Sequence, residues 1–295
     1  MTSTVVRGDR LAAAADQLRV AEQMLFAQQQ SDHHIAIEIT EDIDNIIGTL
    51  AEEGPYAYTL MAETLEDGQI RQRLVQSRDG IRESYVDLHD AVGLRKWTST
   101  TQFLSTWYNF HAGWAQVESK TDGQRSDVES LVLFPTMGTT GITGELFWLR
   151  ATTGGDRREG QSVGELRLEL LNDHDAYLDA ARAGDVDAML ATTATDAQVG
   201  IRDYLSDTPG SMVELDGSAA AADYLRKFFA AYRIERIDVV QRHVEDWYVF
   251  AELRWVLTSA ADGSRSTFLT ADYAEIGPDH KTIARIGHGT EQVQL

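Results

Sequence analysis

The stretch "DWYVFAELRWVLTSAADGSRS", Asp246–Ser266, decides the fold of this chain. Its first part alternates apolar and polar side chains, which predicts a strand, and "ADG" at 261–263 predicts a hairpin turn into the next strand. A related stretch, "TWYNFHAGWAQVESKTDGQRS", begins earlier in the chain at Thr106 and aligns with it without a gap. The two stretches share a Trp-Tyr pair, a Phe and residues of the turn. The chain is therefore predicted to contain two copies of one domain.

A second pair of segments, nearer the start of each copy, supports the duplication. "HIAIEITEDIDNIIGTLAEEGPYAY" from His34 matches "YLDAARAGDVDAMLATTATDAQVGI" from Tyr177, again without a gap. In the later segment, Gly184 followed by Asp185 predicts the end of one helix and the capped start of another. Each copy continues with a strand, a further helix and a series of long strands. This order predicts an α+β fold, with helices packed on one face of a curved antiparallel sheet.

The boundary between the copies follows from local composition. The segment "ATTGGDRREGQSVGE" from Ala151 is rich in Gly and in charge and lacks apolar periodicity, which is typical of a linker. We therefore predict a first domain at 11–150, a linker at 151–162 and a second domain at 163–295.

The overall composition narrows the class of protein. The net charge of −21 argues against nucleic-acid binding, which draws on clustered Lys and Arg. Cysteine is absent, which excludes disulfides, thiol nucleophiles and cysteine-ligated metals. No apolar run is long enough to span a membrane, and the N-terminus lacks the pattern of a signal peptide. We expect a cytoplasmic protein without a membrane partner.

The repeated pattern resembles a known superfamily. A Tyr before "AGDVDAMLATTATDAQV", a helix after "DG", and long strands ending in "DYAEIGPDHKTIARI" are similar to nuclear-transport-factor-2-like (NTF2-like) proteins, in particular their SnoaL-like and ketosteroid-isomerase-like branch. The resemblance covers residues 166–295 and, through the repeat, about 18–150. It implies two tandem cone-shaped α+β-barrel domains, each with an open end that admits an apolar small molecule.

The resemblance also implies catalytic roles in the second copy. Tyr177 stands where ketosteroid isomerases have the Tyr of an oxyanion hole, and Asp272 stands where they have a neutral carboxylic acid. Ile201 occupies the place of their general-base Asp, which departs from that pattern. Asp203 lies two residues further on and is expected on the same strand face, so it is a candidate substitute for the base.

The first copy fills the corresponding places with other polar residues. Where the second copy has Tyr177, Ile201 and Ala251, the first has His34, Tyr58 and His111. Strand alternation puts His111 on the face that lines the cone. If the three side chains converge, they form an acid–base set suited to dehydration or a retro-aldol step. Substrate contacts are predicted at further cone-lining positions: Trp107, Asn109, Tyr56, Trp247 and Trp255.

These residues lead to two hypotheses of different class. The first is a cofactor-independent lyase/dehydratase or isomerase without a metal, acting by acid–base chemistry on a hydrophobic carbonyl-containing molecule of polyketide, steroid or aromatic type. The second is a non-catalytic small-molecule-binding or assembly module. In it, the two copies form an intramolecular pseudo-dimer through faces that include Tyr248, Glu252 and Arg254. A further homo-oligomer is compatible with both hypotheses.

Overall fold

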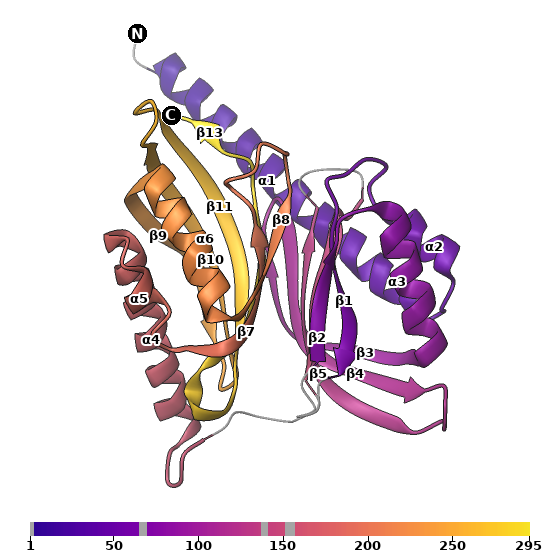
Figure 1. Cartoon of the computed structure of the whole chain (residues 1–295). Coiled ribbons are helices and arrows are strands. Elements are labelled where there is room, and N and C mark those ends of the chain that lie inside the picture. The colour runs from indigo at the N-terminus through magenta and orange to yellow at the C-terminus, as the bar shows by residue number, and fades with distance from the viewer. Residues whose placement is uncertain (1–2, 65–69, 137–140, 151–156) are drawn as a thin grey trace. The chain divides into compact units, whose positions relative to one another are not determined.

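The protein contains two mainly antiparallel sheets accompanied by helices, which confirms the predicted α+β class (Figure 1). The structure is a computed structural model that describes residues 3–64, 70–136, 141–150 and 157–295. The strand order is β2-β1-β6-β5-β4-β3 in the first sheet and β8-β7-β12-β11-β10-β9 in the second, where β13 also pairs with β11. Strands β7 and β12 run parallel. The two orders are the same when strands are matched along the chain, so one topology occurs twice.

In both halves, helices precede and interrupt the strands. The first half consists of α1 (Ser3–Glu38), α2 (Ile43–Gly48), β1 (Ala57–Thr64), β2 (Ile70–Val75), α3 (Arg78–Ala91), β3 (Val92–Leu104), β4 (Tyr108–Ser119), β5 (Arg125–Pro135) and β6 (Gly144–Arg150). The second half consists of α4 (Val163–Ala183), α5 (Val186–Met189), β7 (Thr193–Arg202), β8 (Met212–Asp216), α6 (Gly217–Ala231), β9 (Tyr232–Val244), β10 (Tyr248–Ser259), β11 (Arg265–Ile276), a 3₁₀ turn (Pro278–His280), β12 (Thr282–Gly289) and β13 (Val293–Gln294).

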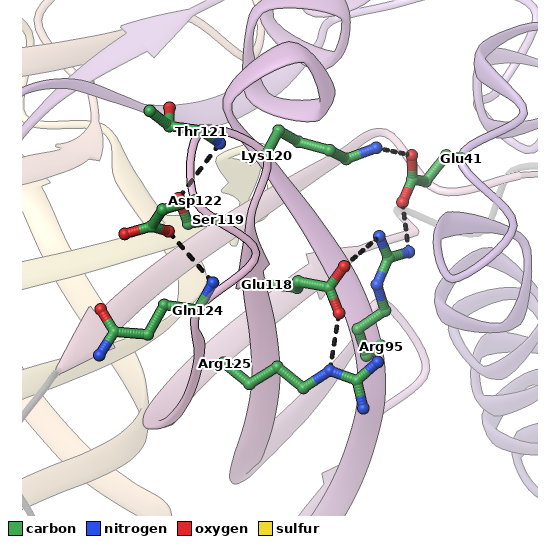
Figure 2. Close-up of polar contacts among 9 residues, drawn as sticks. All are labelled: Glu41, Arg95, Glu118, Ser119, Lys120, Thr121, Asp122, Gln124 and Arg125. Carbon is green, nitrogen blue, oxygen red and sulfur yellow. Dashed lines mark hydrogen bonds and ion pairs between the residues drawn. The ribbon is translucent and has the colours of Figure 1, made fainter.

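The long strands keep the spacing that the sequence predicts between the copies. Strands β3 and β9 have 13 residues each, and their first residues, Val92 and Tyr232, are as far apart in sequence as Thr106 and Asp246. The turn after β4 contains Gly123 at φ 71°, and the turn after β10 contains Gly263 at φ 73°. Both angles lie in the left-handed region that glycine adopts without steric cost. In each turn an Asp accepts a hydrogen bond from the backbone N–H two residues on, at 3.1 Å and 3.0 Å (Figure 2, first half).

The short helices begin as the sequence predicts. Asp185 accepts a hydrogen bond from the Ala188 N–H, 3.0 Å away, and caps α5, while Asp42 caps α2 in the same way at 3.2 Å. Gly184 has φ 69° and ends α4. These caps satisfy N–H groups that have no partner within the first turn of the helix. The helix breaks therefore recur at matching places in the two copies.

The core of the second half lies between one face of its sheet and helices α4 and α6 (Figure 1). Successive side chains of a strand point to opposite faces, so alternate residues of β10 share one face. The side chains of this face that enter the core are Ala251, Leu253, Trp255 and Leu257. They pack against helix residues such as Leu178 and Phe228. The apolar face predicted from alternation is thus the face that the helices cover.

The chain divides into two compact units that do not follow the midpoint of the sequence. Residues before Pro55 and those from Ser77 to the end of β6 form one unit, while 55–76 cluster with the second half. Helix α4 begins at Val163, directly after the predicted linker, and Ser162 caps it together with Glu165. Residues 151–156 of that linker lie outside the described residues. Among the described helices, none has an apolar stretch of the length needed to cross a membrane.

Among the residues of helix α1 whose burial is described, 12–38, only those of its last third enter the core. Residues 12–23 are exposed, and burial begins at Ala27. From there the buried positions recur with helical spacing: Ala27, Ser31, His34, Ile35 and Glu38. Of the adjacent pair His33 and His34, only His34 faces inward. A polar group of this unit is therefore buried at the position that corresponds to Tyr177 in the other copy.

Candidate functional site

The second unit contains a mainly apolar cavity of about 90 Å³. A single buried water needs only about 10–15 Å³, so the cavity has room for part of an organic molecule. Helices α5 and α6 and strands β7, β10 and β11 supply most of the apolar wall: Met189, Ile201, Leu225, Phe228, Trp255 and Phe268. Such a wall favours an apolar ligand, because burial of its surface removes it from water.

Three functional groups meet at one place in the cavity wall. Arg285 Nη1 donates to Asp272 Oδ1 at 2.6 Å, and the Arg285 guanidinium lies 4.3 Å from the centre of the Tyr177 ring. Among the described residues, the Tyr177 hydroxyl has no hydrogen-bond partner. The wall of the cavity therefore contains a hydroxyl group that is available to donate a hydrogen bond, beside the buried Asp272–Arg285 ion pair. Gly287 pairs with Asp272, and a Cβ at this glycine would lie 2.4 Å from Asp272 Cβ, so a side chain there would displace the carboxylate.

Burial controls the protonation of these groups. It raises the pKa of Asp272, while the nearby Arg285 opposes the rise. Because a cation lies 2.6 Å away, we assign Asp272 as a carboxylate that accepts hydrogen bonds, rather than the neutral donor that the resemblance implies. Burial also raises the pKa of Tyr177, which keeps its hydroxyl protonated and able to donate. The Asp272 carboxylate, with its raised pKa, and the protonated Tyr177 hydroxyl thus lie in the same part of the cavity wall.

Behind Tyr177, a second layer of polar groups fixes the ring. His174, one helical turn earlier, stacks on Tyr177 with ring centres 6.1 Å apart. Its Nδ1 accepts from Arg242, 3.1 Å away, and Arg242 also donates to Asp175 at 2.6 Å. Burial, together with Arg285 and Arg242, lowers the pKa of His174 to about 3, so its ring is neutral. His174 therefore positions Tyr177 without adding charge.

The other residues predicted in the second half lie in different surroundings. Ile201 and Trp255 line the cavity, and Trp255 Nε1 donates to Thr270 Oγ1 at 2.9 Å. Strand β7 ends at Arg202, so strand alternation does not extend to Asp203. The Asp203 carboxylate instead accepts from the Leu205 N–H at 2.9 Å and the Tyr224 hydroxyl at 3.2 Å, and it is not part of the cavity wall. Trp247 is buried just before β10, outside that wall.

Arg285 is a residue of this candidate site that was not predicted from the sequence. It lies on β12, where Arg285 pairs with Ala274 and thus shares a sheet face with Asp272, two residues earlier on β11. The signal was present in "TIARIGHG", because strand alternation puts Arg285, Gly287 and Gly289 on one face. A cation at the only charged position of that face indicates a buried partner of opposite charge.

In the first unit, His34 lies in a fully buried polar cluster. Its Nδ1 is 2.5 Å from Thr49 Oγ1, and its Nε2 is 2.9 Å from the Tyr85 hydroxyl. Tyr85 donates to Glu145 Oε2 at 2.5 Å. Glu38, one turn after His34 on α1, places Oε1 3.8 Å from Nε2. Burial and the neighbouring Glu145 raise the pKa of Glu38 well above its ordinary value.

His111 belongs to a separate hydrogen-bonded group. Its Nε2 accepts from Asn109 Nδ2 at 2.8 Å, and its Nδ1 is 3.2 Å from Ser99 Oγ. Asn109 also donates to Ser31 on α1 at 2.5 Å. Burial lowers the pKa of His111 to about 4, so the ring is neutral at pH 7. Both His34 and His111 contact the edge or face of Phe134, with ring centres 5.7 Å and 5.8 Å away.

The remaining predicted residues of the first copy are buried. Tyr56 directly precedes β1 and Tyr58 is its second residue, and both belong to the segment 55–76 that clusters with the second unit. Trp107 precedes β4 and packs edge-on against Tyr108, with ring centres 4.6 Å apart. The proposed convergence of Tyr58 with His34 and His111 stays a prediction.

Comparison with known proteins identifies the fold of the second half. Residues 174–285 match a family model described as a SnoaL-like domain, so this part of the chain is a SnoaL-like domain. The first half repeats the strand order of this domain. No curated protein sequence matches the chain.

Solved structures similar to the chain are related only distantly. An LEH-like epoxide hydrolase from M. tuberculosis is 16% identical, covering 41% of this chain and 83% of its own, with a TM-score of 0.33. A ketosteroid isomerase-like protein from Erwinia carotovora atroseptica is 13% identical, covering 43% and 98%, with a TM-score of 0.35. An NTF2-like protein from Burkholderia xenovorans is 15% identical, covering 44% and 92%, with a TM-score of 0.34.

Proposed function

We propose that the SnoaL-like second domain is a cofactor-independent lyase/dehydratase or isomerase that acts by acid–base chemistry on a hydrophobic carbonyl-containing small molecule. One observation carries the proposal: an apolar cavity whose wall holds the unengaged Tyr177 hydroxyl beside the Asp272–Arg285 ion pair. Perturbed ionisable groups in an apolar pocket are typical of acid–base sites.

The proposed chemistry begins with removal of a proton alpha to the substrate carbonyl. Asp272 accepts this proton, and its raised pKa makes it a stronger base than a solvated Asp. Tyr177 donates a hydrogen bond to the oxygen of the resulting enolate. Once Asp272 is protonated, the positive charge of Arg285 is no longer neutralised and stabilises the enolate.

The second half of the cycle returns the proton. In an isomerase, Asp272 delivers it to a different carbon of the enolate. In a dehydratase, the enolate expels a β-hydroxyl group, which takes up the proton and leaves as water. Both outcomes use the same pair of groups, so the position of a leaving group in the substrate decides between them.

Ile201 favours the alternative of a non-catalytic binding module. It lines the cavity at the position where the resemblance puts a general base. In this alternative, the domain binds the same apolar molecules and transfers no proton.

Exchange of alpha protons distinguishes the two functions. A panel of cyclic ketones is incubated with the protein in D₂O, and loss of the alpha-proton signal is followed by NMR. The wild type is expected to exchange at least one ketone. The variants Asp272→Asn and Tyr177→Phe are expected to lose about 10²–10⁴-fold in rate, the usual contribution of a positioned acid or base. Binding of the ketone, measured by quenching of Trp fluorescence, is retained.

Two further variants locate the activity. Asp223→Asn, on the exposed side of α6, is the matched control and keeps the wild-type rate. His111→Asn tests the other half of the chain and is also expected to keep it. A loss in His111→Asn but not in Asp272→Asn assigns the activity to the first domain. Binding of ketones by the wild type without any exchange supports the binding module instead.

A further inference from the structure

The first unit holds a group of metal-ligating side chains that the proposed function does not use. His34 and Glu38 come from adjacent turns of α1, and Glu145 comes from β6. One ligand atom from each lies within 4.8 Å of the other two, and all three residues are buried. The side chain of His34 is completely covered, and those of Glu38 and Glu145 are exposed by only 11% and 8%.

The hydrogen bonds of His34 fix which ring nitrogen faces the carboxylates. The Thr49 hydroxyl donates to the Ile46 carbonyl at 2.6 Å, so its oxygen accepts from His34 Nδ1–H. The proton of a neutral ring is then on Nδ1, and the lone pair of Nε2 points toward Tyr85, Glu38 and Glu145. A histidine that ligates a metal is usually held in this way, with its other nitrogen bonded to a protein oxygen.

With both carboxyl groups ionised, the cluster lacks one proton or one cation. Tyr85 has a single hydroxyl proton, which it donates to Glu145 at 2.5 Å. The Tyr85 oxygen then faces the lone pair of His34 Nε2 at 2.9 Å, and two acceptors at that distance repel. The repulsion is removed by one additional proton, on His34 or on a carboxyl group of the cluster, or by a metal ion bound between Nε2 and the acidic side chains.

The second copy lacks this cluster, because all three of its residues differ there. The positions that correspond to His34, Glu38 and Glu145 are Tyr177, Ala181 and Arg285. None of these three can ligate a metal as His and Glu do. The threonine that orients His34 has a counterpart in Thr192, so this residue is common to both copies whereas the three ligand positions differ.

We propose that His34 Nε2, Glu38 and Glu145 bind a divalent transition-metal ion such as Zn²⁺. Ligand atoms that each lie about 2.1 Å from a tetrahedral ion are about 3.4 Å apart. The distances from Nε2 are 3.5 Å to Glu145 Oε2 and 3.8 Å to Glu38 Oε1, close to that value. One nitrogen and two carboxylate oxygens suit Zn²⁺ better than Ca²⁺ or Mg²⁺, which prefer oxygen alone. Three protein ligands leave one position for water or another ligand.

The test measures metal binding by the full chain. The protein is dialysed against a chelator and titrated with Zn²⁺ by calorimetry, and with Co²⁺ by its visible absorption. The expected result is one equivalent bound, with the absorption band of a low-coordinate cobalt site. Glu38→Gln and Glu145→Gln each weaken binding by more than about tenfold, and Thr49→Val, which frees Nδ1, weakens it by about 10–100-fold.

A matched variant controls for unspecific binding to acidic groups. His280 Nδ1 is 2.7 Å from Glu169 Oε1 in the second unit, so Glu169→Gln removes a carboxylate from another buried His without touching the proposed site. It should leave Zn²⁺ affinity unchanged. Circular dichroism identifies which variants are folded, and Glu38→Gln, at the edge of the cluster, serves if Glu145→Gln does not fold. If the wild type binds no equivalent of Zn²⁺ or Co²⁺, or if folded Glu38→Gln binds as tightly, the cluster is held by a proton and the proposal is wrong.

Discussion

The two halves of the chain have the same strand register but opposite charge at the same point of the sheet. Val132 pairs with Phe147 in the first sheet, and their counterparts in the second, Asp272 and Gly287, pair in the same way. By this register Glu145 occupies the place of Arg285. In the second half the guanidinium of Arg285 stacks on Tyr177, whereas in the first Glu145 lies 3.5 Å from His34.

A second exchange occurs between neighbouring strands. Ala251 pairs with Asp272 in the second sheet, and His111 pairs with Val132 in the first, so the polar group has moved to the other strand of the pair. In the first half, the inward polar groups bond to one another and to α1. In the second, Tyr177 keeps a free hydroxyl at a cavity. The same strand topology therefore holds a closed polar network in one half and an open site in the other.

The largest expected effect comes from breaking the buried ion pair of the second half. Arg285→Met leaves the Asp272 carboxylate without its cation, and loss of one partner of such a pair costs about 3–5 kcal/mol. The free energy of unfolding, measured by urea titration at pH 7 with circular dichroism, should fall by this amount.

The double variant Arg285→Met/Asp272→Leu sharpens the result. Removal of both charges leaves no unpaired group, so most of the lost stability should return. If the double variant is no more stable than Arg285→Met alone, Arg285 stabilises the second half through packing on Tyr177 rather than through its charge.

The fold was predictable because it depends on patterns that survive in both copies. The alternation in Asp246–Ser266, the Gly at the hairpin turn and the Asp that caps each short helix are local signals, and the repeat supplied each of them twice. The inward position of Tyr177, Ile201 and His111 follows from the same periodicities. These predictions needed no knowledge of which side chains meet in space.

The partners of the site residues were not predictable in the same way. Arg285 meets Asp272 across two strands, and Glu145 meets His34 between a strand and a helix that lie far apart in sequence. Such pairs depend on which elements lie side by side and in which register, and neither can be deduced from local periodicity. Asp203 illustrates a further limit, because the parity rule requires a strand and β7 ends one residue before it.

The next expected effect is a loss of stability at low pH, caused by buried histidines in both halves. In the unfolded chain a histidine takes up its proton near pH 6.5, as an approximate reference value. Burial lowers the pKa of His111 to about 4 in the first half, and of His174 and His288 to about 3 in the second. Each of these rings stabilises the fold fully above about pH 6.5 and loses this contribution as the pH falls toward its folded pKa.

The change of the free energy of unfolding with pH can be measured by thermal or urea unfolding between pH 7 and pH 5. Each neutral buried His makes the free energy of unfolding fall by about 1.4 kcal/mol per pH unit once the unfolded chain is protonated. The variants His111→Asn and His174→Asn should each reduce this pH dependence by the contribution of one histidine. Burial also lowers the pKa of His89 in the first half, so both halves should lose stability on acidification. Unchanged slopes in both variants would show that these rings are protonated in the folded protein.

The smallest effect is expected at the ion pairs near the hairpin turns. In the first half, Glu41 accepts from Arg95 at 2.6 Å and from Lys120, and ties the residues after α1 to the turn between β4 and β5 (Figure 2). In the second half the acid has moved to β9, where Glu235 accepts from Arg265 at 3.0 Å and Thr258 at 2.6 Å.

Both networks lie near the surface, where water and salt weaken charge pairs. Glu41→Gln should lower the free energy of unfolding by no more than about 1 kcal/mol, and about 1 M NaCl should remove most of that difference. Glu235→Gln should lower the free energy of unfolding by less, because Arg265, which loses its carboxylate partner, is more exposed than Arg95 or Lys120. A loss in Glu41→Gln that salt does not reduce would mean that Glu41 holds the end of α1 through geometry. In that case Glu41→Gln should also weaken Zn²⁺ binding, because His34 and Glu38 lie on the last two turns of that helix.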